Sequence, residues 1–210
     1  WDVKKKLDIR PGDPIVPDSS FAVMANPNLL LAKAWDNRIG CALAAETARR
    51  LVGQKHPNIL YTVATVQEEV GLRGAKTSSS KVRPDVGLAL DVGMAHDTPG
   101  TEGDEKLGGG PLIVIYDASS IPNHRLRDLV IDTAEKLELP LQFEAVERGG
   151  TDAGRIHMSG EGVPSLSMGV AARYIHSHVS IIDRRDYEAT VKLLVALVKR
   201  LDRKTVESLI

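Results

Sequence analysis

Acidic side chains recur at the ends of the elements that this sequence predicts. Asp36 stands just before a helical pattern, and Asp91 ends an apolar run. Glu68 and Glu69 directly follow another apolar run, residues 59–66. Because ligands of open α/β sheets bind outside the carboxyl ends of the strands, these four acids are expected at one edge of a sheet. Gathered carboxylates are costly to bury unpaired, and a divalent cation would remove that cost.

A nitrogen ligand for such a cation is available in "RYIHSHVS", residues 173–180. His176 and His178 alternate along this segment, which we predict to be extended, so both imidazoles are expected on one side. Carboxylates mixed with imidazole suit zinc, cobalt or manganese better than calcium. A bridging aspartate with ligands on each side would make a two-metal site, which activates water and stabilises an oxyanion.

Each of these residues also has an ordinary structural interpretation. Asp36 alone could be the N-cap of the following helix, and Asp91 alone a turn residue after its strand. A Glu-Glu pair is usually solvated charge, and a single histidine such as His176 is more often structural than a ligand. The recurrence of acids at element ends favours the metal site.

The glycine-rich stretch "GGTDAG", residues 149–154, is a second candidate. It lacks the lysine of a phosphate loop and the spacing of a dinucleotide fingerprint, which argues against nucleotide binding. Gly150, Thr151 and Asp152 are therefore candidate substrate-binding residues, with capping of a short helix as the alternative for the last two. No G-x-S-x-G elbow supports a serine hydrolase.

Strands and helices alternate after residue 36, which predicts an α/β fold with a mixed, mostly parallel sheet flanked by helices. Residues 59–66 are expected to be a strand buried on both faces. The other expected strands are residues 86–92, 111–117, 141–146 and 163–169; the expected helices are 36–53, 123–138 and one that begins near Asp183.

Residues 1–30 lie outside this alternation. Prolines interrupt their short apolar runs, which predicts a few β segments and turns. We therefore expect a separate β region at residues 1–30 and a catalytic α/β domain at residues 31–210.

The overall charge and cysteine content limit the classes of partner. Among 210 residues, 27 Lys and Arg nearly balance 28 Asp and Glu, so nothing favours nucleic acid or an acidic membrane surface. A small molecule or peptide fits better. The single cysteine, Cys41, predicts a reducing compartment, the cytoplasm, and no apolar run has the length of a membrane helix.

Six motifs occur in the order and approximate spacing of a known family: "AKAWDNRIG", "QEEVGLRGA", "ALDVG", "KLGGGP", "GGTDAG" and "RYIHS". Over residues 30–202 the chain resembles the tetrahedral, or deblocking, aminopeptidases. These co-catalytic metallopeptidases include glutamyl aminopeptidases, and some members carry an endoglucanase label.

The resemblance implies a zinc-peptidase-like catalytic domain with two divalent ions, zinc or cobalt, with manganese as a further alternative. Asp36 would bridge the ions, Asp91 would bind the first, and Glu69 and His176 the second. Glu68 would be the general base on the attacking water. A peptide substrate and a homo-oligomer, a dodecamer built from dimers, are implied in the same way.

Two departures from the family pattern stand out. A proline is usual where this chain has His178. The family's first metal also takes a histidine from a segment that precedes an inserted β domain, and residues 1–30 resemble the last strands of that insertion. We therefore expect the C-terminal part of a longer enzyme, in which the second metal position is complete and turnover by this chain alone is slow.

Three alternatives to a metal-dependent aminopeptidase remain. A related two-metal deacylase or carboxypeptidase would use the same chemistry, and a noncatalytic fragment would fold without turnover. A glycoside hydrolase would need two carboxylates and no metal, and we disfavour it.

Overall fold

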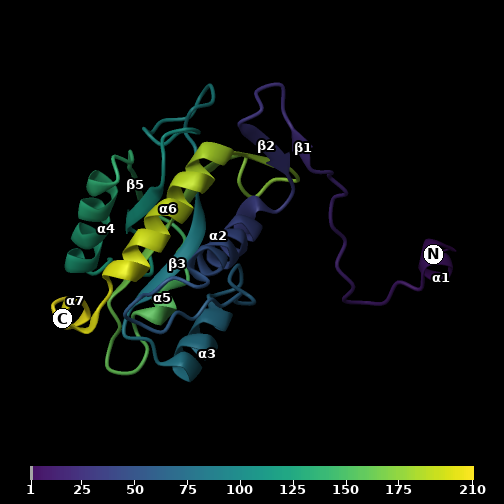
Figure 1. The fold of residues 1–210 in the computed structure, drawn as a ribbon. Coiled ribbons are helices and arrows are strands. Elements are labelled where there is room, and N and C mark those ends of the chain that lie inside the picture. Colours follow the sequence, from purple (N-terminus) through teal and green to yellow (C-terminus); the bar gives the residue numbers. More distant parts are fainter. Residues whose placement is uncertain (1) are drawn as a thin grey trace.

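A computed structural model describes residues 2–210, which form one layer of sheet with helices around it (Figure 1). The strands are β1 (Ala22–Val23), β2 (Leu29–Ala32), β3 (Gly87–Met94), β4 (Leu112–Tyr116), β5 (Gln142–Ala145), β6 (Ser165–Arg173) and β7 (Ser180–Asp183). The helices are α1 (Asp2–Leu7), α2 (Trp35–Leu51), α3 (Arg73–Val82), α4 (His124–Lys136), α5 (Ala153–Ile156), α6 (Arg184–Arg200) and α7 (Arg203–Glu207).

The strands form one mixed sheet, and this confirms the α/β fold. The order along the sheet is β1-β2-β7-β6-β4-β5, and β3 pairs with β6. The β3–β6 and β4–β5 pairs are parallel, whereas β1–β2, β2–β7, β4–β6 and β6–β7 are antiparallel. Parallel pairing is therefore confined to two strand pairs. The long β6 at the centre pairs with strands on both of its edges.

The helices cover the sheet with the apolar faces that the sequence predicts. Asn123 caps α4, because its side chain accepts a hydrogen bond from the backbone N–H of Leu126. Leu126, Val130 and Ala134, four residues apart, are buried against the core. The helix α6 lies between α2 and α4 and packs on both (Figure 1).

Residues 59–66 do not form the buried strand that we predicted. They run between α2 and α3 without strand pairing, and Ile59 and Val66 are 81% and 68% exposed. β-branched residues favour strands only where a partner supplies hydrogen bonds and packing. Among the described residues β3 pairs only with β6, so no ladder forms beside this segment.

The N-terminal region differs in part from the prediction. Residues 2–7 are helical, residues 8–21 are mostly exposed, and only β1 and β2 are strands. Figure 1 shows α1 well away from the body at the end of an extended segment. Residue 1 of the predicted β region lies outside the described residues. No helix within residues 2–210 combines the length and apolar character needed to span a membrane.

Candidate functional site

The start of α2 places Asp36. The N-cap of α2 is Ala34, which makes no side-chain capping bond, and Asp36 and Asn37 have non-helical backbone angles. Asn37 accepts a hydrogen bond from the Gly40 N–H at 2.9 Å and donates one to the Leu90 carbonyl at 2.8 Å. The bond to Leu90 connects the first turn of α2 to β3. The interpretation of Asp36 as only an N-cap is therefore wrong.

A tight turn places Glu68 and Glu69. The Glu68 carbonyl accepts hydrogen bonds from the N–H groups of Gly71 and Leu72, and the Gly74 N–H donates to the Val66 carbonyl at 2.9 Å. A Cβ atom on Gly74 would overlap the backbone of Val66, so only glycine allows α3 to begin this close to the preceding segment. We call residues 66–74 the Glu68 turn.

His176 lies in a turn between β6 and β7 and not in the extended segment that we predicted. Residues 174–178 form turns and bends, and the backbone of His176 is left-handed with φ of 61°. The antiparallel pairs Ala172–Ile182 and Arg173–Ile181 fix both ends of the turn. This turn aims the His176 ring at Asp36.

Three of the predicted residues converge. The Nε2 atom of His176 lies 3.0 Å from Oδ2 of Asp36 and 3.9 Å from Oε2 of Glu69. One ligand atom from each lies within 4.8 Å of the others, and these residues come from three separate parts of the chain. Such a set of two carboxylates and one imidazole fits a transition-metal ion.

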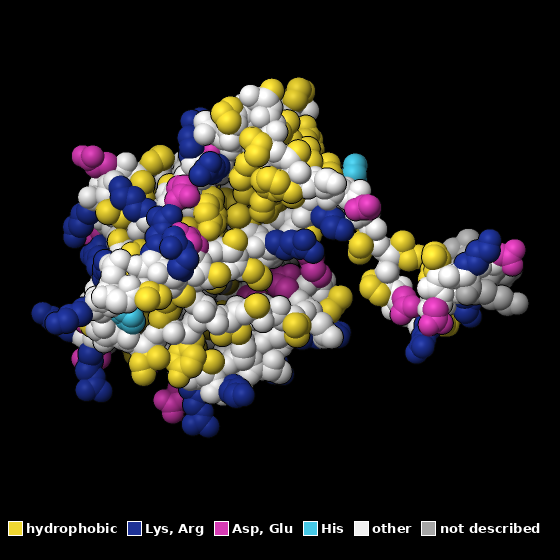
Figure 2. Space-filling model, turned by 45° about the vertical axis from the view of Figure 1, so that its right-hand side comes forward, with side chains coloured by type: hydrophobic (Ala, Val, Ile, Leu, Met, Phe, Trp, Pro, Cys, Tyr) yellow, Lys and Arg dark blue, Asp and Glu magenta, His cyan; other side chains and the backbone are white. Residues whose placement is uncertain are grey.

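The cluster lines an open pocket of about 560 Å³. The other lining residues include Val16, Pro17, Lys33, Arg38, Ser177 and His178. Acidic side chains gather in a recess beside Lys and Arg side chains in Figure 2. Lys33 and Arg38 were not among the predicted site residues, although both flank Asp36 in "AKAWDNRIG".

Asp91 does not join the group of three. It lies in the interior of β3, which continues to Met94, and its Oδ1 accepts a hydrogen bond from the Val92 N–H at 2.8 Å. Pairing with β6 continues β3 two residues beyond the predicted strand, residues 86–92, so Asp91 does not lie at a strand end. Burial, followed by the negative charges of Asp36 and Glu68, raises the pKa of Asp91 well above its usual value.

Glu68 and Glu69 have raised pKa values for the same reasons. Burial and the nearby carboxylate of Asp152 raise the pKa of Glu68 to about 7, with further contributions from Glu69 and Asp36. Burial and Asp36 also raise the pKa of Glu69, which His176 partly offsets. The acids therefore share an excess of negative charge that a bound cation would relieve.

The "GGTDAG" residues lie in a separate set of hydrogen bonds. Thr151 donates to Oδ2 of Asp117 at 3.1 Å, and Oδ2 of Asp152 accepts from Thr65 at 2.6 Å. Asp152 makes no side-chain capping bond to α5, so the capping alternative fails for it. Gly150 lies against the side chain of Ser119.

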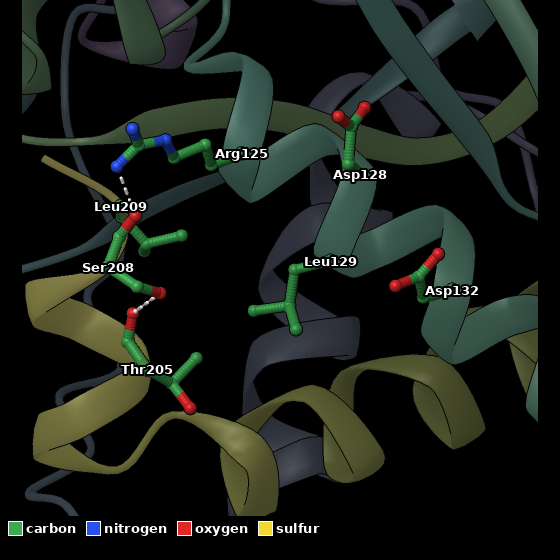
Figure 3. A pocket seen from close by; sticks show the side chains of 7 residues that line it. All are labelled: Arg125, Asp128, Leu129, Asp132, Thr205, Ser208 and Leu209. Atoms are coloured by element: carbon green, nitrogen blue, oxygen red, sulfur yellow. Dashed lines mark hydrogen bonds between the residues drawn. The ribbon is translucent and has the colours of Figure 1, made fainter.

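A second pocket, of about 260 Å³, lies between α4 and α7. In Figure 3, Asp128 and Asp132 project from α4, one turn apart, while Arg125 donates to the Ser208 carbonyl. Among the described residues no third metal-ligating side chain joins these two acids. The Asp36 pocket is therefore the better candidate for chemistry.

Known proteins share both the sequence and the fold. The sequence model of the M42 glutamyl aminopeptidase family matches residues 2–193. The glutamyl aminopeptidase of Lactococcus lactis subsp. cremoris is 38% identical over 96% of this chain and 56% of its own length. The chain spans about half the length of the curated relatives that it matches.

Two solved structures are similar over most of this chain. The TET aminopeptidase of Thaumarchaeota archaeon SCGC AB-539-E09 has a TM-score of 0.93 and 47% identity over 96% of this chain and 58% of its own. The TET1 peptidase of Pyrococcus horikoshii has a TM-score of 0.77 and 34% identity over 87% of this chain and 53% of its own. That peptidase is described as able to assemble into a tetrahedron or a large octahedral shell. Two other structures with this fold are described as an endoglucanase and as a peptidase/endoglucanase.

Proposed function

This chain belongs to the M42 glutamyl aminopeptidase family, and from that premise we propose that it carries the active site of a metal-dependent aminopeptidase. The reaction is hydrolysis of the first peptide bond of a peptide with a free N-terminus. The observation that carries the proposal is the convergence of Asp36, Glu69 and His176 from three separate elements.

These three side chains would hold one divalent cation, zinc or cobalt, with manganese as the alternative. Asp36 and Asp91 would contribute to holding a second cation. When bound, the cations supply Lewis acidity at the scissile carbonyl and lower the pKa of the attacking water. The shared excess of negative charge on these acids supports this assignment.

Glu68 is the proposed general base. Burial and the neighbouring acids raise its pKa to about 7 in the metal-free protein, which shows that its surroundings act strongly on its proton affinity. Positive charge at the neighbouring cluster would lower this pKa again, so the carboxylate stays ionised and can accept a proton from water. It then returns the proton to the leaving amine.

Gly150 and Thr151 remain our proposed substrate-binding residues. The proposed catalytic domain comprises residues 31–210, and the preceding residues, which include β1, are proposed to be used in assembly. We infer a homo-oligomer, since a similar peptidase is described as assembling into shells. The cytoplasm is the proposed location because a single cysteine suits a reducing compartment.

Metal analysis combined with end-blocked peptides tests the function. The 210-residue chain and its His176→Ala variant are loaded with zinc or cobalt, freed of excess metal and analysed by mass spectrometry. His124→Ala, an exposed histidine on α4, is the matched control. We expect the wild type and the control to retain metal, and the His176 variant to lose it.

The same samples are incubated with one peptide in three forms: free at both ends, N-acetylated and C-amidated. Shortening from a free N-terminus, abolished by a chelator, supports the aminopeptidase. Loss of residues from the C-terminus would instead indicate a carboxypeptidase. Loss of the acetyl group would indicate a deacylase. A chain that binds no cation, or cleavage that resists chelation, would overturn the proposal.

A further inference from the structure

The carboxylate of Asp152 has surroundings that neither substrate contact nor helix capping explains. Its Oδ2 accepts a hydrogen bond from Thr65 at 2.6 Å. Its Oδ1 is buried, and within residues 2–210 no donor reaches it. Leaving a carboxylate oxygen buried and unpaired is costly, and the hydrogen bond from Thr65 is the side-chain contact that holds this carboxylate in place.

The residues around Asp152 hold it rigidly. Asp117, which is 2% exposed, accepts hydrogen bonds from the Ser119 N–H and hydroxyl through one oxygen and from Thr151 through the other. The side chain of Ser119 also fills the space beside Gly150 and Gly154, where a Cβ atom would overlap it. Residues 149–154 are therefore fixed to the end of β4.

Thr65 connects this rigid base to the Glu68 turn. Residues 59–66 have no strand partner, and within the described part of the chain the Thr65–Asp152 bond is the one side-chain hydrogen bond that they make. Thr65 precedes Glu68 by three residues, and the next residue, Val66, closes the turn onto Gly74. A shift at Thr65 would therefore move Glu68.

Asp152 and Glu68 are also close enough to interact through charge. After burial, the carboxylate of Asp152 contributes most to raising the pKa of Glu68, more than the adjacent Glu69. This agrees with the hydrogen bonds, which place the two carboxylates on neighbouring segments.

We propose that Asp152 is a positioning residue of the hydrolytic reaction, which acts through Thr65 to hold the Glu68 turn and does not itself contact the peptide. The inference rests on the proposed function of Glu68 as general base. It differs from the substrate-binding role that the sequence alone predicts for Asp152.

Amide hydrogen exchange tests the connection without turnover or metal. Thr65→Val keeps the shape of the side chain but removes the donor, and Thr65→Ser keeps the donor. Thr47→Val is the matched control, because the Thr47 hydroxyl is buried and has no partner within the described residues. A hydrogen bond to a carboxylate changes an opening equilibrium by about tenfold or more.

We therefore expect exchange at the Gly71 and Leu72 amides, which bond to the Glu68 carbonyl, to rise about tenfold in Thr65→Val. Exchange in Thr65→Ser and Thr47→Val should match the wild type. Unchanged exchange in Thr65→Val would overturn the proposal.

Steady-state kinetics then test the effect on the reaction. Thr65→Val and Asp152→Ala should each lower kcat about 10- to 100-fold with little change in KM, since small displacements of a reacting group have effects of this size. The double variant should be no worse than either single one, because both remove one connection. Thr65→Ser should restore kcat.

Two outcomes separate this inference from the proposed function. A raised KM with unchanged kcat in Asp152→Ala would place the carboxylate against the peptide and overturn the positioning role. If the metal-loaded wild type releases no N-terminal residue, the proposed function fails, and the positioning role fails with it whatever the exchange experiment shows.

Discussion

At the scale of single residues, we propose different roles for the adjacent carboxylates of Glu68 and Glu69. Glu69 lies with Asp36 and His176, whereas Glu68 does not belong to that group of three. Adjacent side chains of a turn diverge, so two identical residue types can serve one site in two ways. This division of roles gives a direct test by amide substitution.

We expect Glu68→Gln to retain metal but to lose about 10²- to 10⁴-fold in kcat, the usual contribution of a general base. Glu69→Gln should bind the cation more weakly, because an amide oxygen lacks the charge of the carboxylate. Metal content and peptide hydrolysis, measured on the same preparations, separate the two effects. Equal metal loss in both variants would show that the roles are misassigned.

Ionisation of Glu68 should also destabilise the metal-free protein at high pH. Its pKa of about 7 in the fold exceeds the ordinary value of 4.5, so the folded state binds more protons between these values and stability falls as pH rises through this window. In a chelator-containing buffer, Glu68→Gln should therefore melt higher than the wild type at pH 8.

The difference in melting temperature should shrink towards pH 5, where the folded protein keeps Glu68 protonated. A variant that melts no higher than the wild type at pH 8 would contradict the raised pKa.

At the scale of elements, Asp186 joins α6 to the glycine-rich loop 108–110. Its buried carboxylate accepts hydrogen bonds from the N–H groups of Gly108 and Gly110, both at 2.8 Å. Burial raises the pKa of Asp186 to about 6, although these bonds lower it. One side chain therefore satisfies two backbone donors.

Asp186→Ala should lower the free energy of unfolding by about 1–3 kcal/mol, because it leaves buried N–H groups without acceptors. The pKa of Asp186 in the folded protein lies above its ordinary value of 3.8, so the wild type loses stability as pH rises towards 6. The decrease in unfolding free energy caused by Asp186→Ala should therefore be smaller at pH 7.5 than at pH 5. Urea denaturation at both pH values measures the unfolding free energies of the two proteins.

Asp128→Ala, an exposed aspartate on α4, is the control and should change stability by less than about 0.5 kcal/mol. A loss that grows from pH 5 to pH 7.5 in Asp186→Ala would contradict the sign of the pKa shift.

Local patterns predicted some of these elements and not others. The Asn123 cap and the four-residue spacing of Leu126, Val130 and Ala134 lie within α4 itself, so the sequence predicted that helix well. The apolar residues 59–66 predicted a strand, but pairing depends on a neighbour that no local pattern supplies. Acids at element ends and nearby imidazoles suggested a larger set that includes Asp36, Glu69 and His176. The resemblance to a known family singled out these three.

The hydrogen bond from Thr65 to Asp152 could not be predicted in this way. It joins residues 87 positions apart, and burial of one carboxylate oxygen follows from packing alone. The turn at His176 was missed for a similar reason, since pairing of β6 with β7 forces it.

At the scale of the whole molecule, apolar side chains are exposed along the N-terminal region. Ile15 and Val23 are 89% and 56% exposed. Covering such surface is favourable by about 25 cal/mol for each Å², which favours association of copies of the chain. This region is the one that we propose for assembly.

Ile15→Asp combined with Val23→Asp should therefore weaken self-association at least about tenfold, because charge would have to be desolvated at the contact. Sedimentation equilibrium over a range of concentrations measures this. Ile121→Asp, at an exposed apolar residue before α4, is the matched control. Equal association in all three proteins would exclude residues 15–23 from the contact.

The second edge of β3 bears on how the protein behaves when concentrated. Within residues 2–210 this strand pairs only with β6, and the exposed side chains of Ile59, Tyr61 and Val63 belong to a segment without strand pairing. An open strand edge is a template on which a strand of another molecule can add. Concentrated protein would then associate by strand addition at this edge, and not through loss of the fold.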